Sequence, residues 1–403
     1  MLKSDIVIIG AGHAGGMASI FLRKLKYKGK ITIVGDEKYL PYQRPELSKG
    51  FLYGNIDESR LFLKKDDFYK KNNIDVILNN SVVSIDKEKK ELVLENQRKI
   101  EYKTLILATG SSVNKLNLQK NNDVPLYLRD FDDSKYLRRK LNQSNDIGII
   151  GSGYIGLEVA AIANKLGKNV TIFEIENRVM SRTVSEEVAD FYRKKHEAAG
   201  VSFIFNSQVS AIKKEAKTKV ILNNKDTMEV DLLAVGIGVK PNISIALDAK
   251  LVCNDGIVVD QNCITSDESI FAIGDCTKHP NEIYQNNIRL ESVHNAVEQA
   301  KTSASYIIGK AKPYTQIPWF WTEQYNLKLQ IAGIIDKNAE YFFKGSLEKE
   351  SFSILCVRDE KLIAIESVNN PSDFVIGKKL IESKKKIKTK LISKKNFNMK
   401  NLI

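Results

Sequence analysis

The chain has 403 residues, of which 43% are hydrophobic and 28% charged, and its formal net charge is +13. This length is too great for one small core, so we expect two to three domains, and the composition is that of an ordinary globular protein. No apolar run approaches the length of a membrane span, and the start of the chain lacks the form of a signal peptide. These features exclude a transmembrane protein, and we expect a cytoplasmic one.

The positive charge is concentrated at the end of the chain. Residues 378–403 contain ten lysines and one acid, Glu382, and so hold +9 of the net charge. This tail is either a solvated, partly disordered extension or a basic patch for an acidic partner. Nucleic-acid binding favours interleaved aromatic or arginine side chains, and Phe397 is the only aromatic residue there. We therefore expect no nucleic-acid partner.

A glycine-rich turn joins the first expected strand to the first expected helix. Residues 5–9 form an apolar run typical of a buried parallel strand, and residues 13–27 carry apolar side chains at helical spacing. Between them, Gly10 permits a tight turn, Gly12 lets a pyrophosphate approach the backbone, and Gly15 lets the helix pack closely. The helix N-terminus then faces the phosphate charge. The pattern predicts a dinucleotide site.

The next strand, residues 31–34, ends at an acidic residue. The carboxylate of Asp36 can accept hydrogen bonds from ribose hydroxyls, as this kind of site requires. Two prolines then bracket Tyr42 and Arg44 in a loop that passes into a short helix near residues 47–52. Further strands are expected at residues 75–78, 81–85, 91–94 and 102–111.

The strand, glycine turn, helix and acid recur about 140 residues later. Here Gly151, Gly153 and Gly156 form the turn, and Glu174 follows the second strand. A carboxylate at this place binds a ribose 2′-hydroxyl and repels a 2′-phosphate, and no arginine follows it directly, so NADH is favoured over NADPH. The expected elements are a strand at residues 146–150, a helix at 154–166 and a strand at 169–173.

The order of the later elements indicates an inserted domain. Core strands are expected at residues 231–239 and 270–273, the latter ending in Gly274 and Asp275, and alternating strands after residue 318 indicate an antiparallel sheet. The predicted fold class is α/β, with two Rossmann-like dinucleotide-binding domains, the second inserted in the first, and a C-terminal α+β domain. The predicted divisions are 1–112 and 243–317 for the first domain, 113–242 for the second and 318–403 for the C-terminal domain.

The four cysteines show neither a Cys-x-x-Cys pair nor metal-like spacing, and the four histidines form no metal motif. We expect the cysteines to be small buried hydrophobic residues, and we expect no metal site. The absence of a Cys-x-x-Cys pair matters, because a flavoprotein that reduces disulfides would need a redox thiol beside the flavin.

Taken together, these motifs resemble the FAD-dependent, NADH-using ferredoxin reductases of the putidaredoxin reductase and rubredoxin reductase type, whose wider relatives include apoptosis-inducing factor. The resemblance extends to about residue 370, and the last twenty or so residues match weakly. The segments that carry it are residues 40–49, 107–110, 151–160, 235–241, 273–275, 289–293 and 318–321.

The resemblance implies that the first glycine unit binds FAD and the second binds NADH. It places Asp36 on the adenosine ribose, Arg44 at the pyrophosphate and Asp275 on the ribitol. The residues implied for FAD are Gly10, Gly12, His13, Ala14, Gly15, Asp36, Arg44, Lys49, Val82, Ala108, Thr109, Gly110, Arg129, Gly274, Asp275, Glu291, Ser292, Val293 and Trp321. Those expected at the second nucleotide are Gly151, Gly153, Tyr154, Ile155, Gly156, Glu174 and Gly236.

Two residues are expected to be catalytic. Glu158 resembles the family's partner of a flavin-side lysine, here Lys49, and a buried charge needs such a partner. An ammonium near the flavin N5 would stabilise the negative charge of the reduced flavin. The alternative is a surface glutamate favoured by the dipole at the start of a helix.

The implied activity is hydride transfer from NADH to FAD and single-electron transfer to a small acidic iron-sulfur protein, ferredoxin or rubredoxin, that serves an oxygenase such as a cytochrome P450 or dioxygenase. A monomer or weak dimer is expected. An NADH oxidase, peroxidase or coenzyme A disulfide reductase would need a redox cysteine near residues 40–50, and that loop has none. Reduction of oxygen or a quinone, and a flavoprotein like apoptosis-inducing factor with a nucleic-acid-binding tail, remain as alternatives.

Overall fold

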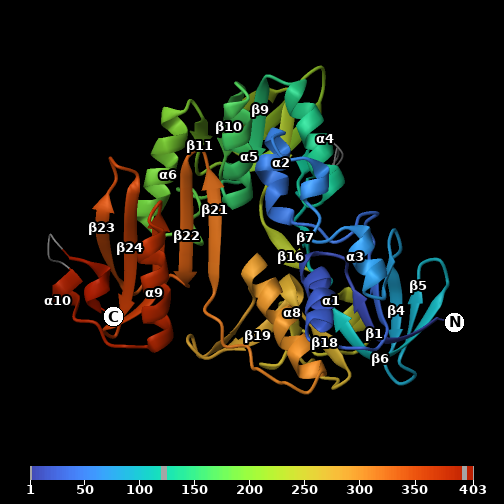
Figure 1. The fold of residues 1–403 in the computed structure, drawn as a ribbon. Coiled ribbons are helices and arrows are strands. Elements are labelled where there is room, and N and C mark those ends of the chain that lie inside the picture. Colours follow the sequence, from blue (N-terminus) through green and yellow to red (C-terminus); the bar gives the residue numbers. More distant parts are fainter. Residues whose placement is uncertain (1, 119–124, 393–396, 403) are drawn as a thin grey trace. The chain divides into compact units, whose positions relative to one another are not determined.

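A computed structural model describes residues 2–118, 125–392 and 397–402 (Figure 1). The chain divides into two compact units, each built from segments that are not consecutive. The first unit comprises Met1–Arg44, Glu58–Ser112 and Val239–Gln316, and the second comprises Pro45–Asp57, Val113–Gly238 and Ile317–Ile403.

The first unit is built on a mixed sheet whose central strands are parallel. Its strand order is β3 (Ile74–Ile77), β2 (Ile31–Val34), β1 (Leu2–Ile9), β6 (Lys99–Leu107), β5 (Glu91–Leu94) and β4 (Val82–Asp86), and β18 (Ile270–Ala272) also pairs with β6. Strands β1, β2, β3, β6 and β18 pair in parallel, whereas β4 and β5 are antiparallel to their neighbours. The parallel strands are apolar runs, as expected for a parallel sheet that is covered on both faces by other elements.

Two helices lie side by side against this sheet, α1 (His13–Lys24) and α8 (Val293–Ile307) (Figure 1). Their small residues Ala18, Ala300 and Ala304 are buried, which lets the helices approach closely. The unit also contains the smaller elements η2 (Glu58–Arg60), α3 (Asp66–Lys71), α7 (Ser244–Asp248), β17 (Ile257–Val258), η3 (Gly274–Cys276), β19 (Thr277–Asn281) and β20 (Asn286–Ile288), and the pair β7 (Ser111–Val113) and β16 (Val239–Pro241).

The second unit contains an all-parallel sheet in the order β11 (Ser202–Ile204), β10 (Asn169–Phe173), β9 (Asp146–Ile150), β15 (Leu232–Val235) and β8 (Leu126–Tyr127). Its helices are α2 (Gly50–Tyr53), α4 (Phe131–Asn142), α5 (Tyr154–Lys165) and α6 (Glu186–Ala198). A three-stranded antiparallel sheet of β12 (Val209–Lys214), β13 (Thr218–Leu222) and β14 (Thr227–Val230) adjoins it.

The same unit holds an antiparallel sheet in the order β21 (Trp319–Gln324), β22 (Leu327–Gly333), β25 (Lys361–Val368), β24 (Ser351–Arg358) and β23 (Glu340–Ser346). Helix α9 (Pro371–Ser383) lies along this sheet (Figure 1). One apolar core runs through the unit, because Leu329 and Phe352 of this sheet cluster with Ile149 and Leu157 of the parallel part. The predicted fold class is confirmed.

Several predicted boundaries were wrong. The helix expected at residues 13–27 ends at Lys24, and Lys26 adopts a left-handed backbone (φ 66°) that cannot continue it. The strand expected at 231–239 is interrupted: β15 ends at Val235, and β16 begins at Val239 after the irregular residues 236–238, where Gly238 has φ +92°. The short helix near 47–52 is two pieces, η1 (Arg44–Ser48) and α2.

The Lys-rich tail is folded wherever the structure describes it. It forms the end of α9, α10 (Thr389–Ile392) and η4 (Met399–Leu402). Its apolar residues Ile387, Met399 and Leu402 are buried, while lysines such as Lys388 are exposed. These segments are therefore packed and are not a solvated extension; Lys394 and Lys395 lie outside the described residues.

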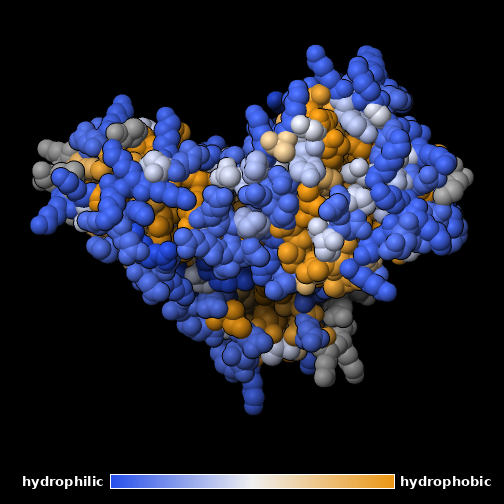
Figure 2. Space-filling view, turned by 90° about the horizontal axis from the view of Figure 1, so that it is seen from below, coloured by the Kyte–Doolittle hydropathy of each residue, from blue (hydrophilic) through white to orange (hydrophobic). Residues whose placement is uncertain are grey.

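No helix of the described residues has the length and hydrophobicity needed to cross a membrane. Hydrophilic residues cover most of the face drawn in Figure 2, and hydrophobic residues appear between them in patches.

Candidate functional site

The first glycine turn has two glycines that the fold itself requires. Gly10 has φ +110°, and a Cβ there would lie 2.1 Å from the carbonyl oxygen of Ala108. A Cβ on Gly15 would lie 2.0 Å from the carbonyl oxygen of Gly10. In contrast, the nearest atom to a Cβ on Gly12 is 3.8 Å away, in the Arg44 guanidinium group. The fold leaves room at Gly12, and this room is available to a ligand.

The second glycine turn repeats this geometry in the second unit. Gly151 has φ +96°, and a Cβ there would lie only 2.6 Å from the carbonyl oxygen of Gly236. A Cβ on Gly156 would lie 2.1 Å from the carbonyl oxygen of Gly151. The nearest atom to a Cβ on Gly153 is again distant, at 4.0 Å. Both turns therefore combine close packing at their outer glycines with an open middle position.

The helices that follow these turns have uncapped N-termini. Among described helices of twelve residues or more, α4, α6, α8 and α9 each begin with a side chain that accepts a backbone N–H, namely Asp130, Ser185, Ser292 and Asn370. Helices α1 and α5 have no such side chain, since Gly12 and Gly153 occupy the cap position. Their free N–H groups and positive dipole ends suit an anion such as a pyrophosphate.

In the first unit, Arg44 lies beside the glycine turn. Its guanidinium group pairs with Glu37 and lies 5.1 Å from the Tyr42 ring centroid, and the Tyr42 hydroxyl donates to Glu37 at 2.5 Å. Asp36, the acid expected on the ribose, is exposed and accepts the Glu37 N–H at 3.1 Å. The sequence interpretation missed Glu37 as the residue that holds Arg44.

The end of β18 brings a second carboxylate to the same unit. Asp275 accepts a hydrogen bond from the Ser111 hydroxyl at 2.9 Å. The adjacent Gly274 donates its N–H to the Gln299 side chain at 2.7 Å, and a Cβ at Gly274 would lie 3.0 Å from Ala14 of the glycine turn. Ala14 and Asp275 were both expected at FAD, and the fold places them in neighbouring segments although they are far apart in sequence.

His13, the first residue of α1, is largely buried. Burial lowers its pKa to about 4, with a smaller effect from Arg44, so the imidazole is neutral at pH 7. Its Nδ1 atom is buried and has no hydrogen-bond partner among the described residues. A polar group of a bound ligand would satisfy this atom.

Other residues expected at FAD have local structural partners. Ser292 caps α8 by accepting the Asn295 N–H at 3.1 Å, and Glu291 pairs with Arg289. The Arg129 backbone N–H donates to Asp133 at 2.9 Å at the start of α4. The rest are placed as follows: Ala108, Thr109 and Gly110 follow β6, Val82 begins β4, Val293 begins α8, and Trp321 lies half-buried on β21, its ring 5.4 Å from that of Trp319.

Glu174 lies at the second glycine turn but is already hydrogen-bonded. It is 8% exposed, and its Oε2 accepts the backbone N–H of Ser152 at 2.6 Å and the Ser152 hydroxyl at 2.5 Å. Its Oε1 accepts the Glu176 N–H at 2.9 Å. The carboxylate thus holds the turn in shape, a role that the sequence interpretation missed. At the start of α5, Ile155 is 42% exposed, and the centroid of the Tyr154 ring lies 4.3 Å from that of Phe320.

The structure brings Lys49 and Glu158 together within the second unit. The Lys49 Nζ is 2.8 Å from the Glu158 Oε1, and the Glu158 side chain is only 2% exposed. The alternative of a surface glutamate at this position is therefore wrong. Glu158 also accepts hydrogen bonds from Ser48 at 2.5 Å and Thr322 at 2.6 Å, two contacts that the sequence interpretation missed.

The described residues contain no group of three or more His, Cys, Asp or Glu side chains that could hold a metal. Cys263, Cys276 and Cys356 are buried, Cys253 is partly buried, and burial raises the pKa of all four thiols. Raised thiol pKa values disfavour the thiolate that disulfide chemistry needs.

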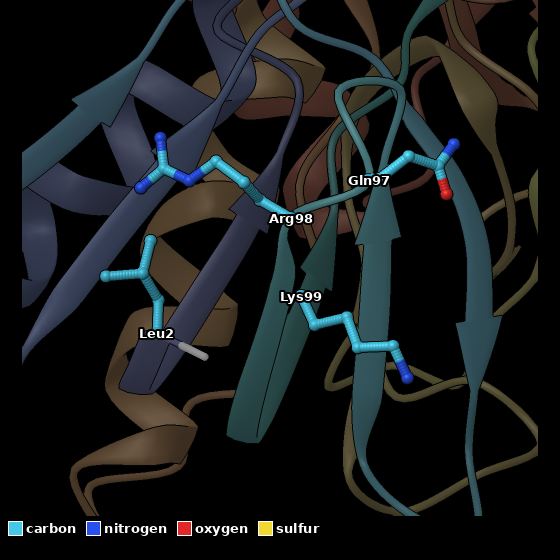
Figure 3. A pocket seen from close by; sticks show the side chains of 4 residues that line it. All are labelled: Leu2, Gln97, Arg98 and Lys99. Atoms are coloured by element: carbon cyan, nitrogen blue, oxygen red, sulfur yellow. The ribbon is translucent and has the colours of Figure 1, made fainter.

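A surface hollow in the first unit is lined by Leu2, Gln97, Arg98 and Lys99 (Figure 3). Figure 3 shows the Arg98 and Gln97 side chains pointing in opposite directions. Because these side chains do not converge on one point, the hollow offers no chemistry comparable to that of the two glycine turns.

Comparison with family models matches almost the whole chain. Residues 4–300 match the pyridine nucleotide-disulphide oxidoreductase model, and residues 319–403 match the reductase C-terminal model. The second match includes the Lys-rich tail.

Among similar proteins, a rubredoxin-NAD(+) reductase of Pseudomonas putida is 39% identical over 369 residues, covering 91% of this chain and 96% of the relative. A rhodocoxin reductase of Rhodococcus erythropolis is 37% identical, covering 98% of this chain and 93% of the relative.

Two solved structures of reductases also match this chain. The ferredoxin reductase for the CYP199A2 system from Rhodopseudomonas palustris matches with a TM-score of 0.95 and 39% identity, covering 98% of this chain and 99% of that one. The reductase in a covalent putidaredoxin reductase–putidaredoxin complex matches with a TM-score of 0.95 and 32% identity, covering 100% and 98%.

Proposed function

Because this chain belongs to the pyridine nucleotide-disulphide oxidoreductase family, we propose that it is an FAD-dependent oxidoreductase that takes hydride from NADH and delivers single electrons to a small iron-sulfur protein. The proposed partner is an acidic ferredoxin or rubredoxin serving an oxygenase, and the proposed location is the cytoplasm. Relatives named for rubredoxin and rhodocoxin support this partner class. The proposed domain division is 1–112 with 243–317, 113–242, and 318–403.

The two open glycine positions support binding of two dinucleotides. We assign FAD to the first turn, because the unpartnered His13 nitrogen, Arg44 and Asp275 all belong to the first unit and offer contacts for phosphate and hydroxyl groups. We assign NADH to the second turn, where the buried carboxylate of Glu174 disfavours a 2′-phosphate. FAD, when bound, supplies the conversion from hydride transfer to single-electron transfer.

The buried Lys49–Glu158 pair is the observation that carries the proposal. Two of the three ammonium donors of Lys49 are engaged, one by Glu158 at 2.8 Å and one by the Pro45 carbonyl at 3.3 Å. Among the described residues the third donor has no partner, so it can hydrogen-bond to a bound cofactor. An oriented ammonium group stabilises negative charge that develops during hydride transfer. Lys49 is thus the proposed catalytic residue and Glu158 its partner.

The first test is the effect of Lys49→Met on flavin reduction. The purified wild-type protein is expected to be yellow and to bleach when mixed anaerobically with NADH. In the variant, the rate constant at saturating NADH should fall about tenfold or more, since an oriented charge is lost. Stopped-flow absorbance measures this rate.

Lys99→Met is the matched control, because the Lys99 side chain is more than half exposed and pairs with Glu91 at the similar distance of 2.7 Å. Its flavin should be reduced at the wild-type rate. Equal rates in both variants would contradict the role of Lys49.

Electron delivery is then measured as cytochrome c reduction with and without added ferredoxin. Equally fast turnover with oxygen or a quinone alone would favour an oxidase or quinone reductase.

A further inference from the structure

A line of buried polar side chains extends from Glu158 through the second unit. The Thr322 hydroxyl lies 2.6 Å from Glu158 Oε1, and the Gln324 amide nitrogen lies 3.2 Å from the Thr322 hydroxyl. The Gln324 amide oxygen lies 2.8 Å from His196 Nε2, and His196 Nδ1 lies 3.3 Å from the Tyr325 hydroxyl. These contacts connect α5, β21 and α6.

The middle of this line is closed to water. His196 and Thr322 are 0% exposed, and Gln324 is 1% exposed. Thr322 and Gln324 are two residues apart on β21, so their side chains point to the same face of the strand. Polar groups buried in this way must satisfy one another, because no solvent is available to them.

Chemistry fixes the direction of every hydrogen bond. An ionised Glu158 can only accept, so the Thr322 hydroxyl donates to it, and the Thr322 oxygen accepts from the Gln324 NH₂ group. The Gln324 oxygen then faces His196, whose Nε2 must carry the proton. The Tyr325 hydroxyl donates to the remaining nitrogen, Nδ1.

The protonation state of His196 agrees with this assignment. Burial lowers its pKa to about 4, and the hydrogen bond to Gln324 opposes this effect. The imidazole is therefore neutral at pH 7, with one donor and one acceptor nitrogen, as the line requires. The order of donors does not change across the physiological pH range.

We propose that Thr322 is a positioning residue for the Glu158–Lys49 pair, and that Gln324 and His196 hold its hydroxyl in the donating orientation. This inference rests on the function proposed above. Thr322 and Lys49 bind the same oxygen, Glu158 Oε1, while Ser48 binds Oε2 at 2.5 Å. With both oxygens fixed, the carboxylate cannot rotate, and the Lys49 ammonium group is held in one place. A misplacement of such a group lowers catalytic rate strongly.

The first experiment compares Thr322→Val with Thr322→Ser in the FAD-loaded protein. Valine keeps the volume but leaves Glu158 without one donor, so the rate constant of flavin reduction at saturating NADH should fall about tenfold. The dissociation constant for NADH should stay unchanged, and serine should restore the rate. Ser353→Ala is the matched control, because Ser353 is also fully buried in the C-terminal sheet but bonds to Ser367 at 3.1 Å.

The second experiment combines Thr322→Val with Gln324→Met. Gln324→Met alone should slow flavin reduction, but it should add nothing in the double variant, since Gln324 acts through the Thr322 hydroxyl. Additive effects of the two substitutions would overturn the proposed order of action. A wild-type rate in Thr322→Val would overturn the positioning role.

The outcome for Lys49→Met separates this inference from the function on which it rests. If wild-type protein is not reduced by NADH, the proposed function fails. If wild-type protein is reduced and Lys49→Met is slow, but Thr322→Val is normal, only the positioning role fails.

Discussion

At the scale of single residues, the second unit contains another buried carboxylate besides Glu158. Glu366 on β25 is 1% exposed and accepts the backbone N–H of Ser185, at the start of α6, at 3.0 Å. Burial raises its pKa to about 7, and the hydrogen bonds from Ser185 oppose this rise. Among the residues that the structure describes, no lysine pairs with Glu366 as Lys49 pairs with Glu158.

Glu366→Gln should stabilise the protein at pH 8. A carboxyl group with a raised folded-state pKa contributes stability below its unfolded pKa, near 4.5, and loses it as pH rises through about 7. Removing the charge should raise the free energy of unfolding by about 3 kcal/mol at pH 8, with little effect near pH 4.5. Thermal unfolding at pH 8 and pH 5 measures the difference, and the same gain at both pH values would contradict a charged Glu366.

The resemblance predicted the Lys49–Glu158 pair, which the structure shows, but the sequence did not predict the other contacts of these side chains. Glu158 and Lys49 were assigned through a resemblance, whereas Thr322 lies 164 positions from Glu158 and carries no motif. Asp36 and Glu37 are adjacent acids, and the pattern could not show that Glu37 binds Arg44. Such contacts depend on tertiary packing, which neither spacing nor periodicity encodes.

At the scale of elements, the two glycine turns separate what the fold requires from what a ligand requires. Gly15 and Gly156 are packed against backbone carbonyls, whereas Gly12 and Gly153 have open space. A Cβ at Gly12 or Gly153 would lie no closer than 3.8 Å to another atom of the protein. It should therefore interfere only with a bound nucleotide.

Gly12→Ala and Gly153→Ala should therefore fold but lose different ligands. Gly12→Ala should be colourless with FAD weakened at least about tenfold, and Gly153→Ala should stay yellow but bind NADH equally poorly, because a methyl group blocks the approach of the pyrophosphate. The visible spectrum and an NADH titration measure these effects. Loss of FAD in Gly153→Ala with normal NADH binding would reverse the assignment of the turns.

Gly15→Ala and Gly156→Ala provide the comparison. Their Cβ atoms would lie 2.0 and 2.1 Å from carbonyl oxygens, so both proteins should be destabilised even without ligand.

Strand–turn–helix order was predictable because apolar runs and glycines are local signals. The end of α1 was not, because the left-handed conformation of Lys26 has no glycine to mark it.

At the scale of the whole molecule, the net charge of +13 should speed the approach of an acidic iron-sulfur protein. Increasing ionic strength from about 0.1 to 1 M shortens the screening length from about 10 to 3 Å, so the second-order rate of ferredoxin reduction should fall steeply. Flavin reduction by NADH, measured in the same buffers, is the control and should change much less. A ferredoxin rate that does not depend on salt would contradict electrostatic steering.

The division of the chain into two units has a consequence for synthesis on the ribosome. The chain passes from one unit to the other five times, at residues 44/45, 57/58, 112/113, 238/239 and 316/317. The first unit is complete only when Gln316 has emerged, and the second only when its last segment, Ile317–Ile403, has emerged. Domains normally fold in order as they emerge. Here the sheet of the first unit lacks β18 until the whole stretch 113–238 has been made, so no single cut of the chain yields either unit.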